Sequence, residues 1–150
     1  MPYLAFAFAI GCMIPLQAAI NSQLKTPLGG STLLAALVSF AVGTLALAIV
    51  AASTDRVQNL AGVAAARPWQ LTGGLLGAVF VFGTTLLAPR IGVAKMTALI
   101  VAGQVIVSMI LDHQGWLGLA VREITPLRVA GGALVVAGVT LVNFDQLFSA

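Results

Sequence analysis

The sequence STLLAALVSFAVGTLALAIVAAS occupies residues 31–53 and contains no charged side chain. An α-helix needs about 20 mostly apolar residues to cross the roughly 30 Å of hydrocarbon in a bilayer. The run Leu33-Leu34-Ala35-Ala36-Leu37-Val38 is apolar without alternation, whereas a β-barrel strand would place every second residue in a polar lumen. Residues 31–53 therefore predict a transmembrane helix.

Uncharged windows of similar length recur along the chain, and charged residues stand between them. We expect five membrane spans, at residues 3–23, 31–53, 69–88, 93–112 and 127–145. The last two windows are short, but charged side chains at their ends can reach the headgroups. The first window lacks a basic leader and its apolar run is too long for a signal peptide, so we interpret it as a retained span. The sequence thus predicts an all-α, polytopic membrane protein, with residues 1–150 in a single transmembrane domain.

The composition also indicates that lipid is the main surroundings of the chain. Hydrophobic residues make up 60% of the sequence and charged residues 7%, against roughly 45–50% and 25% in soluble domains. A soluble domain of this size would lack the polar groups to cover its surface, which excludes a soluble enzyme and a disordered tail. The net charge is +3, but the 7 Lys and Arg residues are scattered singly, so no nucleic-acid partner is expected.

The breaks between the predicted spans have local causes. Lys25-Thr26-Pro27-Leu28-Gly29-Gly30 predicts a turn built from proline and paired glycines, and Pro89-Arg90-Ile91-Gly92 separates the third and fourth spans. Thr125 and Pro126 predict the start of the last helix, as N-cap and first helical residue. Residues 55–67 carry apolar residues at helical spacing, and both an amphipathic helix in the membrane interface and a plain loop are compatible with them.

The basic residues give almost no bias in membrane orientation. Five spans place the termini on opposite sides, and the excess of Lys and Arg sets which side is cytoplasmic. The side of the N-terminus holds four basic residues and the other side three: Arg56, Arg67, Arg122 and Arg128 against Lys25, Arg90 and Lys95. Two interpretations stay open: a weak preference for a cytoplasmic N-terminus, and insertion in both orientations to give an antiparallel pair with the symmetry of an inverted-repeat transporter.

Gln17 and Asn21 are the first candidate site residues, because no carboxylate, Lys or Arg lies at the centre of a predicted span. The two amides are four residues apart and share one helix face. Pro15 cannot donate a hydrogen bond to the carbonyl of Gly11, so it should kink the helix, and the freed carbonyl must face protein or water. We favour a solute cavity here over simple bonds between helices, worth about 0.6 kcal/mol each, since a kink and two amides coincide.

Gln104 and Ser108 form a second candidate pair, again four residues apart, in the fourth predicted span. A glutamine side chain is too costly to leave in lipid, so Gln104 should face protein. Contact with a substrate and hydrogen bonding between helices explain it equally well.

Small residues mark where helices can approach closely. The candidates are the pairs Ser39 and Gly43, Gly73 and Gly77, and Gly131 and Gly138. Packing within the chain is the expected explanation, most of all for the GxxxG of Gly73 and Gly77. A subunit contact is a fair alternative for the pair on the last helix.

Asp112 and His113 end the fourth predicted span. A carboxylate beside a histidine could relay protons or bind an ion, but a solvated helix end accounts for them better. The sequence has no zinc-protease, serine-hydrolase or Walker motif. One Cys and one His also exclude a multi-cysteine metal site. We therefore expect neither an enzyme nor a bound metal or cofactor.

A series of short motifs runs in order through nearly the whole chain. They are Gln17-x-x-x-Asn21-x-x-Leu24, Leu34-x-x-Leu37-Val38-Ser39-Phe40-x-x-Gly43-Thr44, Pro68-Trp69, Gly73-Gly74-Leu75-Leu76-Gly77-Ala78, Pro89-x-Ile91-Gly92-Val93-Ala94, Gly103-Gln104, Leu111-Asp112-His113-x-Gly115 and Arg128-x-x-Gly131. Together they resemble the YdcZ-type family of the drug/metabolite transporter superfamily. The resemblance implies a bacterial inner-membrane half-transporter, which pairs with itself or with a sister chain into a ten-helix unit.

The small multidrug-resistance proteins, a more distant resemblance, carry a glutamate in the first helix for proton coupling. This sequence has Gln17 and Asn21 there, which argues against proton-coupled export of cations. We expect a dimer that moves small metabolites by alternating access. The alternative is a membrane subunit that transports nothing and whose glycine faces serve only assembly.

Overall fold

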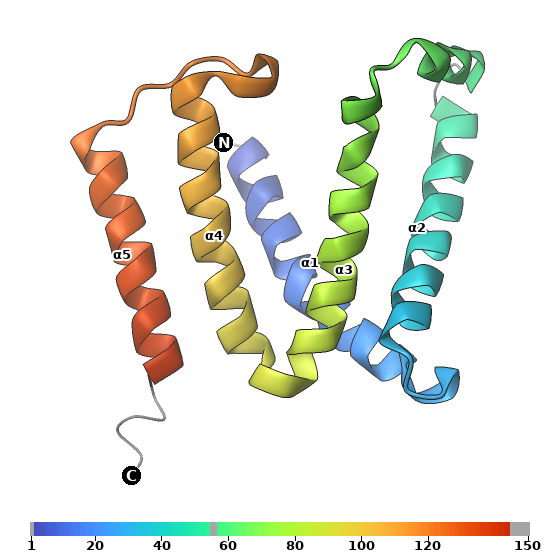
Figure 1. Ribbon diagram of the computed structural model, residues 1–150, viewed down its shortest axis with the longest axis horizontal. Coiled ribbons are helices and arrows are strands. Elements are labelled where there is room, and N and C mark those ends of the chain that lie inside the picture. Colours follow the sequence, from blue (N-terminus) through green and yellow to red (C-terminus); the bar gives the residue numbers. More distant parts are fainter. Residues whose placement is uncertain (1, 55–56, 145–150) are drawn as a thin grey trace. The chain divides into compact units, whose positions relative to one another are not determined.

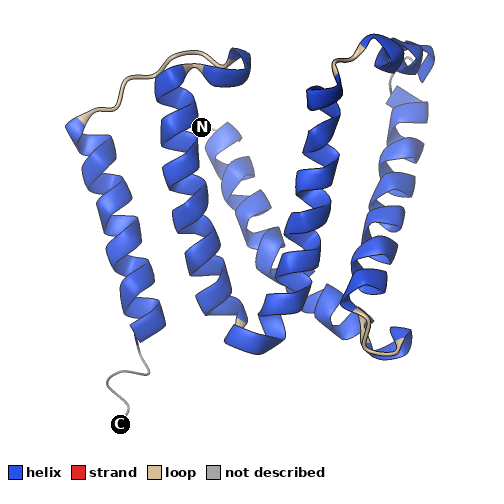
Figure 2. Cartoon of the chain, viewed as in Figure 1, coloured by secondary structure: helices blue, strands red, loops and turns tan. Residues whose placement is uncertain are grey.

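The computed structural model describes residues 2–54 and 57–144. The chain divides into two compact units, Met1–Arg90 and Ile91–Ala150, and each is described here by itself. Every regular element among the described residues is helical, as the colouring in Figure 2 shows. Five of the helices are long and apolar enough to cross a membrane. The predicted all-α fold with five spans is therefore confirmed, while a single domain stays a prediction.

The first unit contains three long helices that run alternately up and down (Figure 1). They are α1 (Pro2–Leu24), α2 (Thr32–Thr54) and α3 (Thr72–Ile91), with short 3₁₀ segments at Thr26–Leu28, Val57–Ala65 and Pro68–Leu71. The expected spans began or ended within three residues of these helices, because span length and flanking charge are fixed by the bilayer. Residues 57–65 form a helix, as one of the two interpretations expected, but it is a 3₁₀ helix; residues 55–56 lie outside the described part.

The predicted turn at residues 25–30 is confirmed. The carbonyl of Lys25 accepts hydrogen bonds from the backbone N–H groups of Leu28 (3.0 Å) and Gly30 (2.9 Å). Gly29 and Gly30 have φ of 64° and 80°, a region that glycine enters without the steric cost of a Cβ. Ser31 then accepts a bond from the N–H of Leu34 at 3.2 Å, which satisfies one of the free donors at the start of α2.

The break after the third span is shorter than expected. α3 continues across Pro89 to Ile91, so Pro89 lies in its last turn and does not end it. Pro89 has no N–H to donate to the carbonyl of Thr85 and its ring crowds that carbonyl, yet the helix continues for two more residues. Gly92 alone breaks the helical path, with φ of 85°, and its carbonyl accepts a bond from Met96 at 3.1 Å as the next helix begins.

The second unit consists of α4 (Val93–Gln114) and α5 (Pro126–Asn143), joined through a 3₁₀ turn at Trp116–Gly118. Thr125 caps α5 by accepting a bond from the N–H of Arg128 at 3.3 Å, and Pro126 is the first helical residue, as predicted. The expected fifth span, residues 127–145, is longer than α5 at its end. Phe144 lies beyond the helix, and residue 145 lies outside the described part.

The described interior is small and made largely of alanine. The buried apolar side chains are Ala18, Ala35, Ala36, Val81, Ala88 and Met96. Large apolar side chains lie outside instead: Phe8, Leu127 and Leu141 are each more than three-quarters exposed. Such a surface is stable in hydrocarbon and unfavourable in water, so the helices present it to lipid.

Candidate solute-binding site

Gln17 and Asn21 occupy the same side of α1 but differ in burial. Gln17 is exposed, whereas Asn21 is 3% exposed. The Nδ2 atom of Asn21 has no hydrogen-bond partner among the described residues. Buried polar groups in folded proteins nearly always have a partner. Asn21 is therefore an exception among the buried polar groups of the described residues.

Gln17 lines a half-open cavity of about 160 Å³ within the first unit. The other lining residues are Ser39, Phe40, Gly43 and Leu47 from α2 and Val81 from α3. A Cβ at Gly43 would meet no atom within 4 Å, so the glycine does not bring helices together here but leaves the cavity wall open. Two residues expected to serve packing, Ser39 and Gly43, thus share a cavity with an amide expected to bind solute.

Thr84 and Thr85 are buried polar residues on α3 that the sequence analysis did not select. Thr84 is 5% exposed, and its hydroxyl donates to the carbonyl of Val81 at 3.1 Å. Thr85 is 0% exposed, and its Oγ1 has no partner among the described residues. The sequence offers no signal that separates the two, because a threonine in a helix can bond to the preceding turn of its own backbone.

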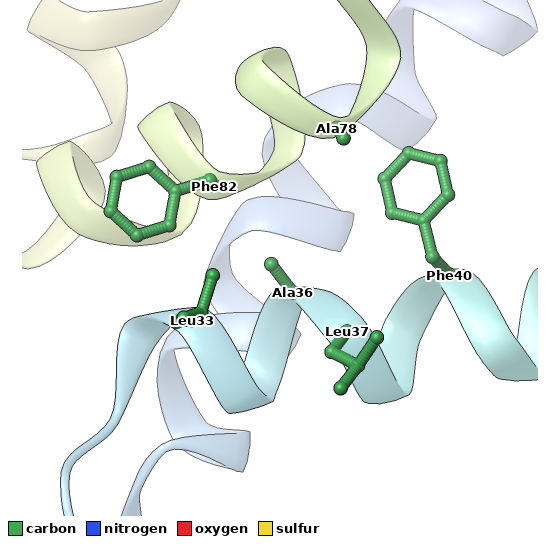
Figure 3. A pocket seen from close by; sticks show the side chains of 6 residues that line it. All are labelled: Leu33, Ala36, Leu37, Phe40, Ala78 and Phe82. Carbon is green, nitrogen blue, oxygen red and sulfur yellow. The ribbon is translucent and has the colours of Figure 1, made fainter. Parts of the chain in front are cut away.

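A second cavity in the first unit, of about 170 Å³, is entirely apolar (Figure 3). Leu33, Ala36, Leu37 and Phe40 line it from α2, and Ala78 and Phe82 line it from α3. Phe40 lines both cavities. A Cβ on Gly77 would lie 3.5 Å from Cζ of Phe40, which is an ordinary van der Waals contact, so Gly77 faces the ring and a small side chain would fit there. A Cβ on Gly73 would meet nothing within 4 Å. A packing role for Gly73 and Gly77 stays a prediction.

α1 remains helical across Pro15, which is half-buried, and Gly11 is exposed. Pro15 has no N–H to donate to the carbonyl of Gly11, so the helix lacks one bond there. The proposed bending at this point stays a prediction.

A family model described as "Putative inner membrane exporter, YdcZ" matches residues 2–141, and so covers α1 through nearly all of α5. The chain belongs to the YdcZ family. Membership confirms the resemblance read from the motifs and, with the five apolar helices, places this YdcZ-family chain in the inner membrane as a multi-pass protein. It also points to an exporter and away from an enzyme. Comparisons with curated proteins and with solved structures give no match.

Gln104 and Ser108 lie on α4 of the YdcZ chain, in the second unit, and both are exposed. Ser108 donates to the carbonyl of Val105 at 2.9 Å, so its hydroxyl is satisfied by its own helix. Thr97 on the same helix has an Oγ1 atom that is buried and without a partner among the described residues. A role for Gln104 and Ser108 in binding solute stays a prediction.

Gly132 is the glycine at which α5 packs closely against α4. A Cβ there would lie 3.3 Å from Met109 Sδ, whereas Gly131 and Gly138 are exposed and a Cβ on either would meet nothing within 4 Å. Packing of α4 on α5 therefore does not account for the pair that the sequence suggested. A contact between subunits stays a prediction for that pair.

Asp112 is paired with a cation in this YdcZ-family structure. Its Oδ2 atom lies 2.9 Å from Nη2 of Arg128, and both side chains are about one-third exposed. The carbonyl of Asp112 accepts a bond from the N–H of Arg122 at 2.8 Å, which fixes the segment between α4 and α5. His113 is exposed beside it. The described residues hold no group of three or more potential metal ligands, and a proton or ion site at Asp112 and His113 stays a prediction.

Proposed function

We propose that this YdcZ-family chain is one half of an exporter for small, uncharged or weakly polar solutes, and that it works as a dimer by alternating access. The observation that carries the proposal is the half-open cavity of about 160 Å³, where the Gln17 amide and the Ser39 hydroxyl meet apolar walls. Small-molecule sites typically combine apolar walls with a few placed polar groups.

The chemistry of the cavity supports an uncharged solute. Its polar lining consists of an amide and a hydroxyl, and no charged residue lines it. An ion would lose its hydration without gaining an opposite charge, which is costly at bilayer depth. A neutral solute loses less and can exchange water for the side chains of Gln17 and Ser39.

The exposed amide side chains of a single chain support the pairing of two chains. Gln17 and Gln104 are exposed although they lie within helices long and apolar enough to span a membrane. Hydrocarbon cannot solvate an amide, so another polypeptide surface should cover at least part of each. A second copy, antiparallel or parallel, or a sister chain would supply that surface and complete a ten-helix unit.

Alternating access needs an element that bends, and we propose that α1 bends at Pro15. Pro15 removes a backbone hydrogen bond one turn after Gly11 and just before Gln17, and such positions are where helices bend. Bending there would change the access of Gln17 to either side of the membrane.

Flux through proteoliposomes tests the proposal. The purified protein is reconstituted, and efflux of a panel of neutral and charged metabolites is measured. We expect efflux of a neutral solute that falls several-fold, up to about tenfold, in Gln17→Ala, since one hydrogen bond to the solute is lost. Gln23→Ala is the matched control, because Gln23 lies on the same helix, is exposed and does not line the cavity.

Two outcomes would count against the proposal. No flux of any solute by well-folded protein favours a subunit that serves only assembly. Equal flux in wild type, Gln17→Ala and Gln23→Ala would remove Gln17 from the site.

A further inference from the structure

Phe40 lies at the boundary between the two cavities of the first unit. The apolar cavity takes its α2 lining from residues between Leu33 and Phe40. The cavity that Gln17 lines takes its α2 lining from residues between Ser39 and Leu47. Phe40 is the residue that the two linings share. The cavities therefore follow one another along α2, and they adjoin at this side chain.

The ring of Phe40 extends from α2 toward α3 (Figure 3). Its far edge faces Gly77, where a Cβ would lie 3.5 Å from Cζ and 3.8 Å from Cε1. Phe82, the other aromatic residue of the apolar cavity, lies at the opposite end of that cavity (Figure 3). Phe40 thus forms a wall across the space between α2 and α3, with one cavity on each side of the ring.

The two cavities differ in chemistry but hardly in size. The one lined by Gln17 and Ser39 measures about 160 Å³, and the apolar one measures about 170 Å³. A dry cavity of about 150 Å³ in another protein holds one benzene molecule. Each cavity therefore has room for one ring-sized group. Side chains that can hydrogen-bond to a solute line the first cavity, whereas the second is lined by apolar side chains alone.

We propose that Phe40 is a specificity-determining residue of the exporter. Its ring closes the apolar cavity to a solute held at Gln17 and Ser39, and thereby favours uncharged solutes with a single ring-sized apolar part. This inference rests on the proposed function and concerns the same site. A second ring that extended along α2 would collide with Phe40, and such overpacking is costly. Lipid chains are as apolar as the cavity walls, so the space available decides, and not the hydrophobicity of the solute.

Binding to the protein in nanodiscs tests the inference separately from transport. The probes are benzyl alcohol, which has one ring and a hydroxyl, and 4-biphenylmethanol, which adds a second ring in line with the first. Ligand-observed NMR measures both Kd values, and empty nanodiscs give the partitioning into lipid. We expect the wild type to bind benzyl alcohol more tightly. Phe40→Ala should join the cavities and lower the Kd of 4-biphenylmethanol, relative to that of benzyl alcohol, by about tenfold, because the second ring gains contacts.

Phe82→Ala is the matched control. Phe40 and Phe82 are both 36% exposed, but Phe82 lines the apolar cavity alone. Its removal should leave the ratio of the two Kd values within about twofold of the wild type. Gln17→Ala should weaken both probes by a similar factor, because it removes a hydrogen bond to the hydroxyl that they share. Phe40→Leu, which shortens the side chain and keeps it apolar, should shift the ratio in the same direction by a smaller factor, and it replaces Phe40→Ala if that variant does not fold.

An unchanged ratio in folded Phe40→Ala or Phe40→Leu would overturn the inference. So would an equal change in Phe82→Ala, a wild type that binds 4-biphenylmethanol as tightly as benzyl alcohol, or a wild type that binds neither. Binding that depends on Gln17 and is selected by Phe40, without flux of any solute, would refute the export proposal and leave the selection by Phe40 standing. Flux that depends on Gln17, with a ratio indifferent to Phe40, would refute this inference alone.

Discussion

Gly132 and its neighbour Gly131 show that adjacent residues on a membrane helix, which point in different directions around the helix axis, can have very different surroundings. The first lies against Met109 of α4, and the second meets nothing within 4 Å. The sequence places three glycines on α5, at 131, 132 and 138, and the seven-residue spacing of 131 and 138 made that pair stand out. Spacing reveals which residues share a face, but the face that meets α4 is decided by packing.

Enlarging Gly132 should separate α4 from α5. We expect Gly132→Leu to lower the free energy of unfolding by about 1–3 kcal/mol, the usual cost of overpacking. Gly131→Leu should change it by no more than about 0.5 kcal/mol. Unfolding is followed by intrinsic fluorescence in a detergent that keeps the protein monomeric, so that subunit contacts do not contribute. A larger loss in Gly131→Leu than in Gly132→Leu would contradict the packing described for α5.

The candidate site was only partly predictable, and the reason is the hydrogen bonding of individual side chains. Gln17 and Asn21 stood out because an amide has more hydrogen-bonding groups than its own helix can satisfy. Thr85 did not stand out, because hydroxyls in membrane helices commonly bond to their own backbone, as Ser108 and Thr140 do here. Only the placement of Oγ1 distinguishes Thr85 from Thr84.

At the scale of helices, most of the fold was predictable. The bilayer dictates the length of a span, and charged residues cannot lie at its centre, so α1, α2 and α4 were expected within two residues at each end. The third helix was misjudged by three residues at each end: it ends later, because Pro89 was interpreted as the break that Gly92 provides, and it begins later, because a 3₁₀ segment at Pro68–Leu71 precedes it. For Val57–Ala65 a helix was one of two interpretations left open, and its 3₁₀ type was not predicted, since the spacing of apolar residues does not distinguish helix types.

Gly92 should be required for its backbone conformation alone. Its φ is 85°, and a Cβ there would meet no atom within 4 Å. Gly92→Ala should therefore cost about 1–3 kcal/mol of stability, because φ of 85° with ψ of 147° is a region that essentially only glycine enters, and Gly92→Asn should cost as much, since asparagine tolerates positive φ mainly in the αL region. Gly103→Ala, in the open interior of α4, is the control and should stabilise by roughly 0.5–1 kcal/mol. Thermal unfolding measures both, and equal Tm values for Gly92→Ala and wild type would show that the junction tolerates another conformation.

At the scale of the whole molecule, the distribution of basic residues hardly favours one orientation in the membrane over the other. Four Lys and Arg on one side against three on the other is too small a difference to direct insertion strongly. An antiparallel pair would follow from insertion both ways.

We expect reporters fused to the C-terminus to appear on both sides of the membrane. The double variant Lys25→Gln, Lys95→Gln leaves four basic residues against one, and should direct the N-terminal side to the cytoplasm and the C-terminus outward. A phosphatase and a fluorescent protein, active on opposite sides, measure the two populations. A reporter signal from one side only, for the wild type expressed without a sister chain, would exclude dual insertion.

The alanine-rich interior has a consequence for how this protein can vary. Ala18, Ala35, Ala36 and Ala88 are buried and have almost no side chain to lose, so truncation, the commonest way to damage a globular core, has little to act on. Added methyl groups at these four sites would instead push neighbouring helices apart. Substitutions at the buried alanines are therefore limited mainly by the size of the new side chain. At the lipid-facing positions, leucine and phenylalanine can replace one another freely.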